Sequence, residues 1–236
     1  MKKIILIAAI LFHLNLSAQV SKWFVSISTG GGIGAPSASL KHQMIQQGFN
    51  QTSSFNFLGI TGTTNYPEKN VSGYTLLRFG KLLRDRKSLF FIAGISEKGE
   101  VIGFKNQGYV DFLGILGGSA GPRPTVKYSI YQAGAGYQYD AIKTRAKLGL
   151  GPSLFLMKYK MNEEESKSAM VPGMIFTGRF PLGRERKLIG FELVLDAKLA
   201  PPVKMKTDSE KGPDSFVPGK VNMYNATVGI ALCFRR

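Results

Sequence analysis

Polar and apolar residues alternate along the segment from Leu188 to Leu199, LIGFELVLDAKL. One set of alternate positions is apolar throughout, and the other carries Glu192, Asp196 and Lys198. Because successive side chains of a β-strand point to opposite faces, this pattern predicts a strand with one oily face and one charged face. A soluble sheet buries the oily face in its core, whereas a membrane barrel turns it toward lipid and turns the charges toward the lumen. The segment by itself is compatible with both arrangements.

Similar strand-like patterns recur along the chain, and they are long. Most of them reach or exceed the roughly 9–11 residues that a tilted strand needs to cross a bilayer. Strands of soluble proteins average about five or six residues, so the lengths favour the membrane arrangement. We predict about eight strands, near residues 22–33, 70–82, 87–103, 124–140, 142–160, 168–182, 187–203 and 220–234.

The joins between these segments alternate between short and long. Outer-membrane barrels show such alternation because their periplasmic turns are short and their external loops are long. We therefore predict an all-β fold, an antiparallel up-and-down transmembrane β-barrel of about eight strands. The apolar stretch Val110–Leu116 in one long join leaves open an extra hairpin, and so ten strands, or a lid that touches lipid. The short joins lie near residues 83–87, 140–143 and 183–187, and the longer ones near residues 34–69, 104–123, 161–167 and 204–219.

The N-terminus has the pattern of a secretory signal peptide. Two lysines precede an apolar stretch from Ile4 to Leu16, and the small residue Ala18 suits a cleavage site. We predict a signal peptide over residues 1–18, one barrel domain over residues 19–236, and export to the outer membrane. The formal net charge of +16 falls to +14 without the two lysines of the signal. For an exported chain this charge favours acidic lipid headgroups, and not nucleic acid, as partners.

Aromatic residues predict two girdles, one at each membrane surface. The first group falls near the periplasmic ends of the predicted strands and comprises Trp23, Phe79, Tyr137, Tyr139, Phe180, Phe191 and Phe234. The second group falls nearer the external ends and comprises Tyr74, Tyr128, Phe155, Tyr159 and Tyr224.

The short joins are rich in basic residues. We predict that they form a rim that contacts phosphate headgroups of the inner leaflet, each charge contributing on the order of 1 kcal/mol near an anionic surface. A simply solvated rim is the alternative. The predicted rim residues are Arg84, Arg86, Lys87, Arg184, Arg186 and Lys187.

A second charged group falls on the strands themselves. If the oily rows face lipid, these side chains point into the lumen, and an eight-stranded barrel is narrow enough for side chains to fill it. Buried charge must be paired, and both signs are present, so we predict a polar plug, with a gated path for small solutes as the alternative. The predicted lumen network comprises Arg78, Arg145, Lys147, Arg179, Glu192, Asp196 and Lys198.

The first long join contains a predicted helix near residues 37–47. Leu40, Met44 and Ile45 share one helical face, and Gly48 suits the helix end. The sequence there has the form P-S-x-x-L-K-x-x-M-x-x-x-G-F, and it follows a signal ending in SAQ and a glycine-rich first strand. With the run of hairpins, these features resemble the small outer-membrane β-barrel proteins of Bacteroidota, a porin-like and OmpA-like group. The resemblance implies the barrel architecture over nearly the whole mature chain and brings no catalytic residues.

Catalytic, cofactor and metal chemistry find little support in the sequence. Gly30, Gly32 and Ala35 fit a G-x-G-x-x-A pattern, but a dinucleotide site needs an acid about 20 residues further on, and the first acid of the chain is Glu68. His42, the one histidine outside the predicted signal, cannot form a metal site by itself. We predict no catalytic residues, no cofactor and no metal.

The sequence therefore predicts a non-enzymatic outer-membrane barrel with a structural or surface-interaction role. One alternative is a secreted or periplasmic lipocalin-like barrel that binds an apolar ligand. Another is a membrane-embedded lipid-modifying enzyme that uses His42 with a serine and an acid brought together by loops. The predicted partners are outer-membrane lipids and an external ligand or envelope protein, which the charged, Pro/Gly-rich join 204–219 could contact.

Overall fold

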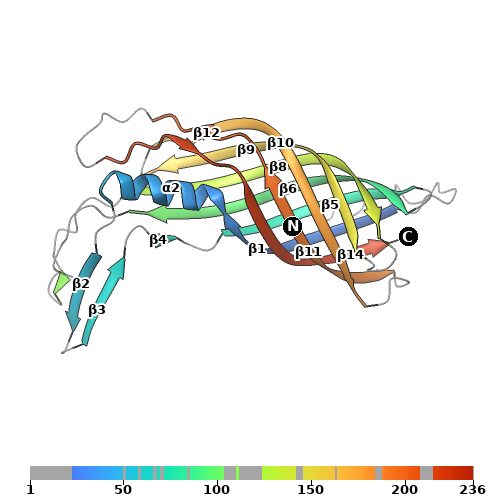
Figure 1. The fold of residues 1–236 in the computed structure, drawn as a ribbon, viewed down its shortest axis with the longest axis horizontal. Helices are drawn as coiled ribbons and strands as arrows, with labels where there is room; N and C mark the ends of the chain where they lie inside the picture. Colours follow the sequence, from blue (N-terminus) through green and yellow to red (C-terminus); the bar gives the residue numbers. More distant parts are fainter. Residues whose placement is uncertain are drawn as a thin grey trace, which may run out of the picture.

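The computed structural model describes a closed β-barrel with a helical insertion (Figure 1). The described residues are 23–49, 52–57, 60–65, 68–69, 72–83, 86–103, 110–111, 124–141, 146–162, 164–183, 188–207 and 215–235. The predicted signal peptide lies outside them. Across these residues, no helix has the length and hydropathy that crossing a membrane would require.

Eight long antiparallel strands make up the barrel wall within the described residues. Each strand pairs with the next one along the chain, and pairing of the first with the last closes the sheet. The predicted eight-stranded up-and-down barrel is thereby confirmed. The strands are β1 (Trp23–Gly34), β5 (Ser72–Leu82), β6 (Lys87–Ile102), β8 (Thr125–Asp140), β9 (Lys147–Met161), β10 (Lys167–Leu182), β11 (Ile189–Leu199) and β14 (Asn225–Arg235).

The short and long connections lie at opposite ends of the barrel. The longer connections carry the helix and the short strands, and Figure 1 shows α2, β2, β3 and β12 at the end away from the C-terminus. We call this the loop end, and we call the other, where the three short joins lie, the turn end. The short elements are α2 (Ala35–Gln46), β2 (Thr52–Phe57), β3 (Ile60–Asn65), β4 (Glu68–Lys69), β7 (Val110–Asp111), β12 (Val203–Lys204) and β13 (Lys220–Val221).

The ten-stranded alternative is wrong. The start of the apolar stretch forms β7, which pairs in parallel with β2 in a small separate sheet. The physical reason lies in the closed wall: β6 pairs directly with β8 over its whole length, so no open edge remains there for another hairpin. Of the stretch Val110–Leu116, only β7 belongs to the described residues.

Helix α2 packs against the inner side of the loop end. It begins two residues before the predicted start, with Pro36 in its first turn, where a missing backbone N–H costs nothing. Leu40 and Met44 are fully buried because residues four apart share one helical face. Ile45, predicted to share that face, is 36% exposed, so this part of the prediction is wrong.

Helix α2, which follows the first strand, is also hydrogen-bonded to the segment that precedes the last strand. The side-chain amide of Gln43 donates to the backbone oxygen of Lys220 at 2.7 Å, and that of Gln47 donates to the oxygen of Val217 at 2.8 Å. Leu40 and Met44 join an apolar core inside the loop end. The other buried residues of this core are Phe49, Val101, Val126, Tyr128, Ile130, Phe155, Met157, Tyr159, Met161, Val203, Met205, Phe216, Val221 and Met223.

Candidate functional site

The barrel interior below the apolar core is lined by charged and polar side chains. On each strand these residues share the inward face, while the large side chains exposed on the outward face are mainly apolar, apart from lysines near the strand ends. In β5, for example, Arg78 is 2% exposed, whereas its neighbours Leu77 and Phe79 are 46% and 36% exposed. The interior is therefore the candidate functional site, and it contains two clusters.

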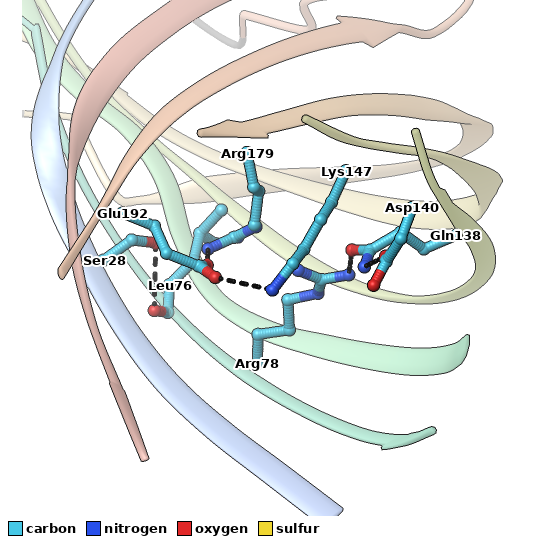
Figure 2. A network of polar contacts seen from close by, with 8 residues as sticks. All are labelled: Ser28, Leu76, Arg78, Gln138, Asp140, Lys147, Arg179 and Glu192. Atoms are coloured by element: carbon cyan, nitrogen blue, oxygen red, sulfur yellow. Dashed lines mark hydrogen bonds and ion pairs between the residues drawn. The ribbon is translucent and has the colours of Figure 1, made fainter. Parts of the chain in front are cut away.

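The cluster nearer the turn end is centred on Glu192 of β11 (Figure 2). Its carboxylate accepts a hydrogen bond of 3.2 Å from the ammonium of Lys147 on β9. The same carboxylate lies 3.8 Å from the guanidinium of Arg179 on β10. Strand register brings the three side chains together. Arg179 pairs with Lys147 on β9 and with Val194 on β11, and Glu192 lies two residues from Val194 on the same face of β11. One acid thus neutralises cations from two neighbouring strands.

Arg78 extends this cluster across the lumen. Its guanidinium donates to the side-chain oxygen of Gln138, whose amide donates to Asp140 at 3.0 Å. The guanidinium also lies 5.0 Å from the ring centroid of Phe24 and 4.4 Å from that of Phe90. Aromatic faces attract cations, so these rings stabilise the charge that the barrel encloses.

The cluster nearer the loop end is centred on Glu97, which sequence reasoning missed. Its carboxylate accepts hydrogen bonds from Tyr128 at 3.0 Å and from Asn225 at 2.6 Å. Ser37 of α2 bonds to the hydroxyl of Tyr128, so the helix is tied to this cluster. Lys198 donates to the backbone oxygen of Ser96 at 3.0 Å.

A β-bulge explains why strict alternation misplaces Glu97. Pairing between β6 and β8 shifts register between Ile95 and Glu97. A bulge adds one residue to one strand, so the faces of the following residues exchange. Both Ser96 and Glu97 are buried as a result, whereas Lys98, which would have faced inward, is exposed. No local signal other than Gly94, at φ +155°, marks this irregularity.

Asp196 lies inside the barrel and is 3% exposed. Register places Thr177 and Thr227 beside it on the adjacent strands. Within the part of the chain that the structure describes, the carboxylate oxygens of Asp196 and both threonine hydroxyls have no hydrogen-bond partner. Buried polar atoms of this kind are ordinarily satisfied by water. The middle of the lumen is therefore a polar environment suited to bound water.

The structure places the described members of the predicted lumen set inside the barrel, but divides them between the two clusters, with Asp196 in neither. Arg78, Arg179, Glu192, Asp196 and Lys198 are at most 3% exposed, and the side chain of Lys147 is 11% exposed. Arg145 lies outside the described residues. Of the predicted rim, Arg86 and Lys87 are exposed at the turn end, and the remaining members lie outside the described residues: Arg84, Arg184, Arg186 and Lys187.

One of the two predicted aromatic girdles is wrong. The turn-end group points outward; Phe191, for example, is 54% exposed. In the loop-end group, Tyr224 is 54% exposed, but the other four side chains are buried in the interior. Their positions have the inward parity of their strands, so they pack against the core and the charged clusters. The four buried residues are Tyr74, Tyr128, Phe155 and Tyr159.

The residues considered for catalysis are not brought together. His42 lies on the exposed side of α2 and contacts Gln46 at 3.0 Å, whereas Ser37 is buried on the other side against Tyr128. The described residues contain no group of three or more His, Cys, Asp or Glu that could hold a metal ion. Within the described residues, the interior holds buried charges and hydroxyl groups, among them the chain of contacts from Ser37 through Tyr128 to Glu97.

Replacing Tyr128 by phenylalanine should lower the free energy of unfolding by about 1–2 kcal/mol, because a hydrogen bond to the buried Glu97 is lost. Urea titration of the refolded barrel would measure the change. Tyr131→Phe is the matched control, since Tyr131 lies on the outward face and is 38% exposed. Equal effects of the two substitutions would contradict a stabilising role for the Glu97 cluster.

The chain is similar in fold, at very low sequence identity, to solved structures of small outer-membrane proteins. No family model and no curated protein matches the chain. Among solved structures, the attachment invasion locus protein Ail of Yersinia pestis, in complex with the heparin analogue sucrose octasulfate, is 9% identical with a TM-score of 0.41, covering 92% of this chain and 100% of that one. The outer membrane protein OprG from Pseudomonas aeruginosa is 9% identical with a TM-score of 0.43 and 92% and 98% coverage.

A third similar structure is Neisserial surface protein A. It is 9% identical to this chain, with a TM-score of 0.38, and the match covers 92% of this chain and 99% of that one.

Proposed function

We propose that this chain is an integral outer-membrane β-barrel with a structural or surface-interaction role, a lumen filled by side chains and no enzymatic activity. The observation that carries this proposal is the inverted distribution of polarity. Charged side chains are buried inside the barrel, and large apolar side chains cover its outside. Lipid, and not water, is the solvent in which that distribution is stable.

The apolar outside extends around the whole barrel. Each of the eight strands exposes at least one large apolar or aromatic side chain, such as Phe91 at 58%, Leu148 at 56% and Ile230 at 54%. Soluble monomers rarely expose a contiguous apolar patch larger than a few hundred Å². Closure of the sheet also leaves no unpaired backbone edge, which a bilayer does not tolerate.

The interior supports a filled lumen. The Glu192 cluster spans the turn end, and α2 with its apolar core occupies the loop end. An eight-stranded barrel has little interior space beyond that of its side chains. We therefore propose no open pore, and the envelope role rests on the barrel as an anchor for its external connections.

The two alternatives have weaker support. A lipocalin-like barrel needs an apolar interior cavity for its ligand, but here the apolar part of the interior is packed with α2. A lipid-modifying enzyme needs His42 beside a serine and an acid, and α2 holds His42 and Ser37 on different sides. A Bacteroidota origin stays a prediction from the sequence resemblance, as does cleavage of the signal peptide.

Two measurements test the proposal. The protein should remain in the membrane fraction after carbonate extraction, and its release would contradict an integral barrel. Purified protein in planar bilayers should give no stable ion conductance, because paired side chains and α2 occupy the lumen. Stable single-channel conductance would contradict the filled lumen while leaving the membrane location intact.

A further inference from the structure

Four lysines of the described strands lie side by side on the outward face near the loop end. Lys98 on β6 pairs with Ser129 on β8, which pairs with Lys158 on β9. Two residues closer to the loop end, Lys127 on β8 pairs with Lys160 on β9. Neighbouring strands are about 4.8 Å apart and residues rise about 3.4 Å along a strand, so these four positions fall within roughly 12 Å of one another. We call Lys98, Lys127, Lys158 and Lys160 the lysine platform.

The platform lies directly beyond the apolar wall. Along β9 the outward positions from Leu148 to Leu156 are apolar or proline, and Lys158 and Lys160 follow. Lys158 follows Leu148 by ten residues, about 34 Å along the strand at 3.4 Å per residue, and a strand tilted by about 35–45° needs about 31–35 Å to cross an apolar band of about 25 Å. The lysines therefore lie where the hydrocarbon layer ends and the headgroups begin.

The same surface is concave. Register shifts at Gly73/Thr75 and at Ile95/Glu97 bend the wall, as β-bulges do. The resulting hollow has a volume of about 930 Å³ and is lined by all four platform lysines. Its lining also includes hydroxyl groups, from Thr29, Thr75, Ser129 and Tyr131.

The charge of the hollow is complementary to phosphate. Glu100 is the acidic residue of the lining, and it lies 3.7 Å from Lys127, so the platform keeps a net positive charge. The Lys158 ammonium lies 5.5 Å from the ring centroid of Tyr131, which holds it over the boundary between apolar and basic surface. Ammonium groups form short, charge-assisted hydrogen bonds with phosphate oxygens.

We infer that the lysine platform binds a phosphate-bearing lipid headgroup of the outer leaflet. The occupant is a lipid and not a soluble anion because the platform continues the apolar wall. Acyl chains can lie against Leu154 and Leu156 while the phosphate meets Lys158 and Lys160 above them. The inference rests on the proposed function, since it needs the barrel to lie in an outer membrane. It concerns the opposite end of the barrel from the predicted basic rim.

The test is a lipid-binding titration with the full chain, purified in detergent. The probes are diphosphoryl lipid A and the same lipid after removal of its phosphates, with binding followed by native mass spectrometry. The test variant carries Lys98→Gln, Lys127→Gln, Lys158→Gln and Lys160→Gln. The control variant removes the same charge from exposed lysines of α2 and the loop-end connections, by Lys41→Gln, Lys204→Gln, Lys206→Gln and Lys220→Gln.

Diphosphoryl lipid A should bind the wild type at least ten-fold more tightly than the dephosphorylated lipid. Each platform lysine accounts for about a five-fold change in affinity, so the test variant should lose on the order of 100-fold or more and the control variant less than about two-fold. If the four changes prevent folding, Lys158→Gln with Lys160→Gln should still lose on the order of 20-fold.

Three results would overturn the inference. They are unchanged binding by the test variant, an equal loss in the control variant, and binding of inositol hexakisphosphate as tight as that of lipid A. Carbonate extraction separates this inference from the proposed function. Release of the wild type from membranes contradicts the integral barrel, whereas retention with unchanged lipid binding contradicts the lysine platform alone.

Discussion

Replacing Glu192 by glutamine should lower the free energy of unfolding of the barrel by about 3–5 kcal/mol. The substitution keeps the shape of the side chain but removes the carboxylate that faces Lys147 and Arg179. Two buried cations then lie close together in a medium that screens them poorly. Urea unfolding of the barrel refolded in lipid would measure the change, with fluorescence of Trp23, the only tryptophan of the chain, as the probe.

The matched control for this prediction is Glu100→Gln. Glu100 also forms an ion pair, with Lys127, but the two side chains are 30% and 65% exposed. Exposed pairs contribute about 0–1 kcal/mol, so the control should change stability little. A Glu192→Gln barrel as stable as the control would mean that water in the lumen screens the cluster, and it would contradict the filled interior.

Replacing Leu195 by arginine should cost about 2–4 kcal/mol of stability in lipid, the cost of a cation at the middle of the lipid-facing wall. Leu195 is 44% exposed on the outward face of β11, where it pairs with Gly178 and Val228. The protein should also reach the membrane fraction in smaller amount. Quantitative blotting of membranes and urea unfolding in lipid vesicles would check both results.

Ser129→Arg serves as the control for the lipid-facing substitution. It places the same side chain on the same face but among the platform lysines, where arginine costs about 0–1 kcal/mol. In a water-soluble barrel, arginine at Leu195 would be harmless and would improve solubility. A Leu195→Arg protein that folds in detergent-free buffer would therefore support the lipocalin-like alternative and contradict the membrane barrel.

Strand positions were predictable because alternation is a local property. The segment predicted near 142–160 is observed as Lys147–Met161, and the one near 187–203 as Ile189–Leu199. Alternation also predicted the inward direction of Glu192, which shares parity with Asp196 and Lys198, and of Arg78, which lies between the outward-facing Leu77 and Phe79. The alternation of short and long joins fixed the topology once the strands were known.

Features that depend on other strands were not predictable. Glu97 faces inward because β6 carries one extra residue relative to β8, which no residue pattern within β6 specifies. The error at Tyr74 has a different cause. Tyr74 and Arg78 lie four residues apart on β5 and therefore face the same side, so the predictions of an outward Tyr74 and an inward Arg78 could not both be right. The prediction that Leu40, Met44 and Ile45 share the buried face of α2 was right for Leu40 and Met44 and wrong for Ile45. Packing partners from distant segments decide which side chains of the helix are buried.

The pairing of β1 with β14 limits the order in which the barrel can assemble. These strands pair over eleven residue pairs, and α2 is held by hydrogen bonds to residues near Val217 and Lys220. Contacts between residues so far apart in sequence form late and slowly. Seven strands without β14 would expose two unpaired edges and an unfastened helix, which is a surface prone to aggregation. The barrel therefore closes only when the last strand, β14, pairs with β1.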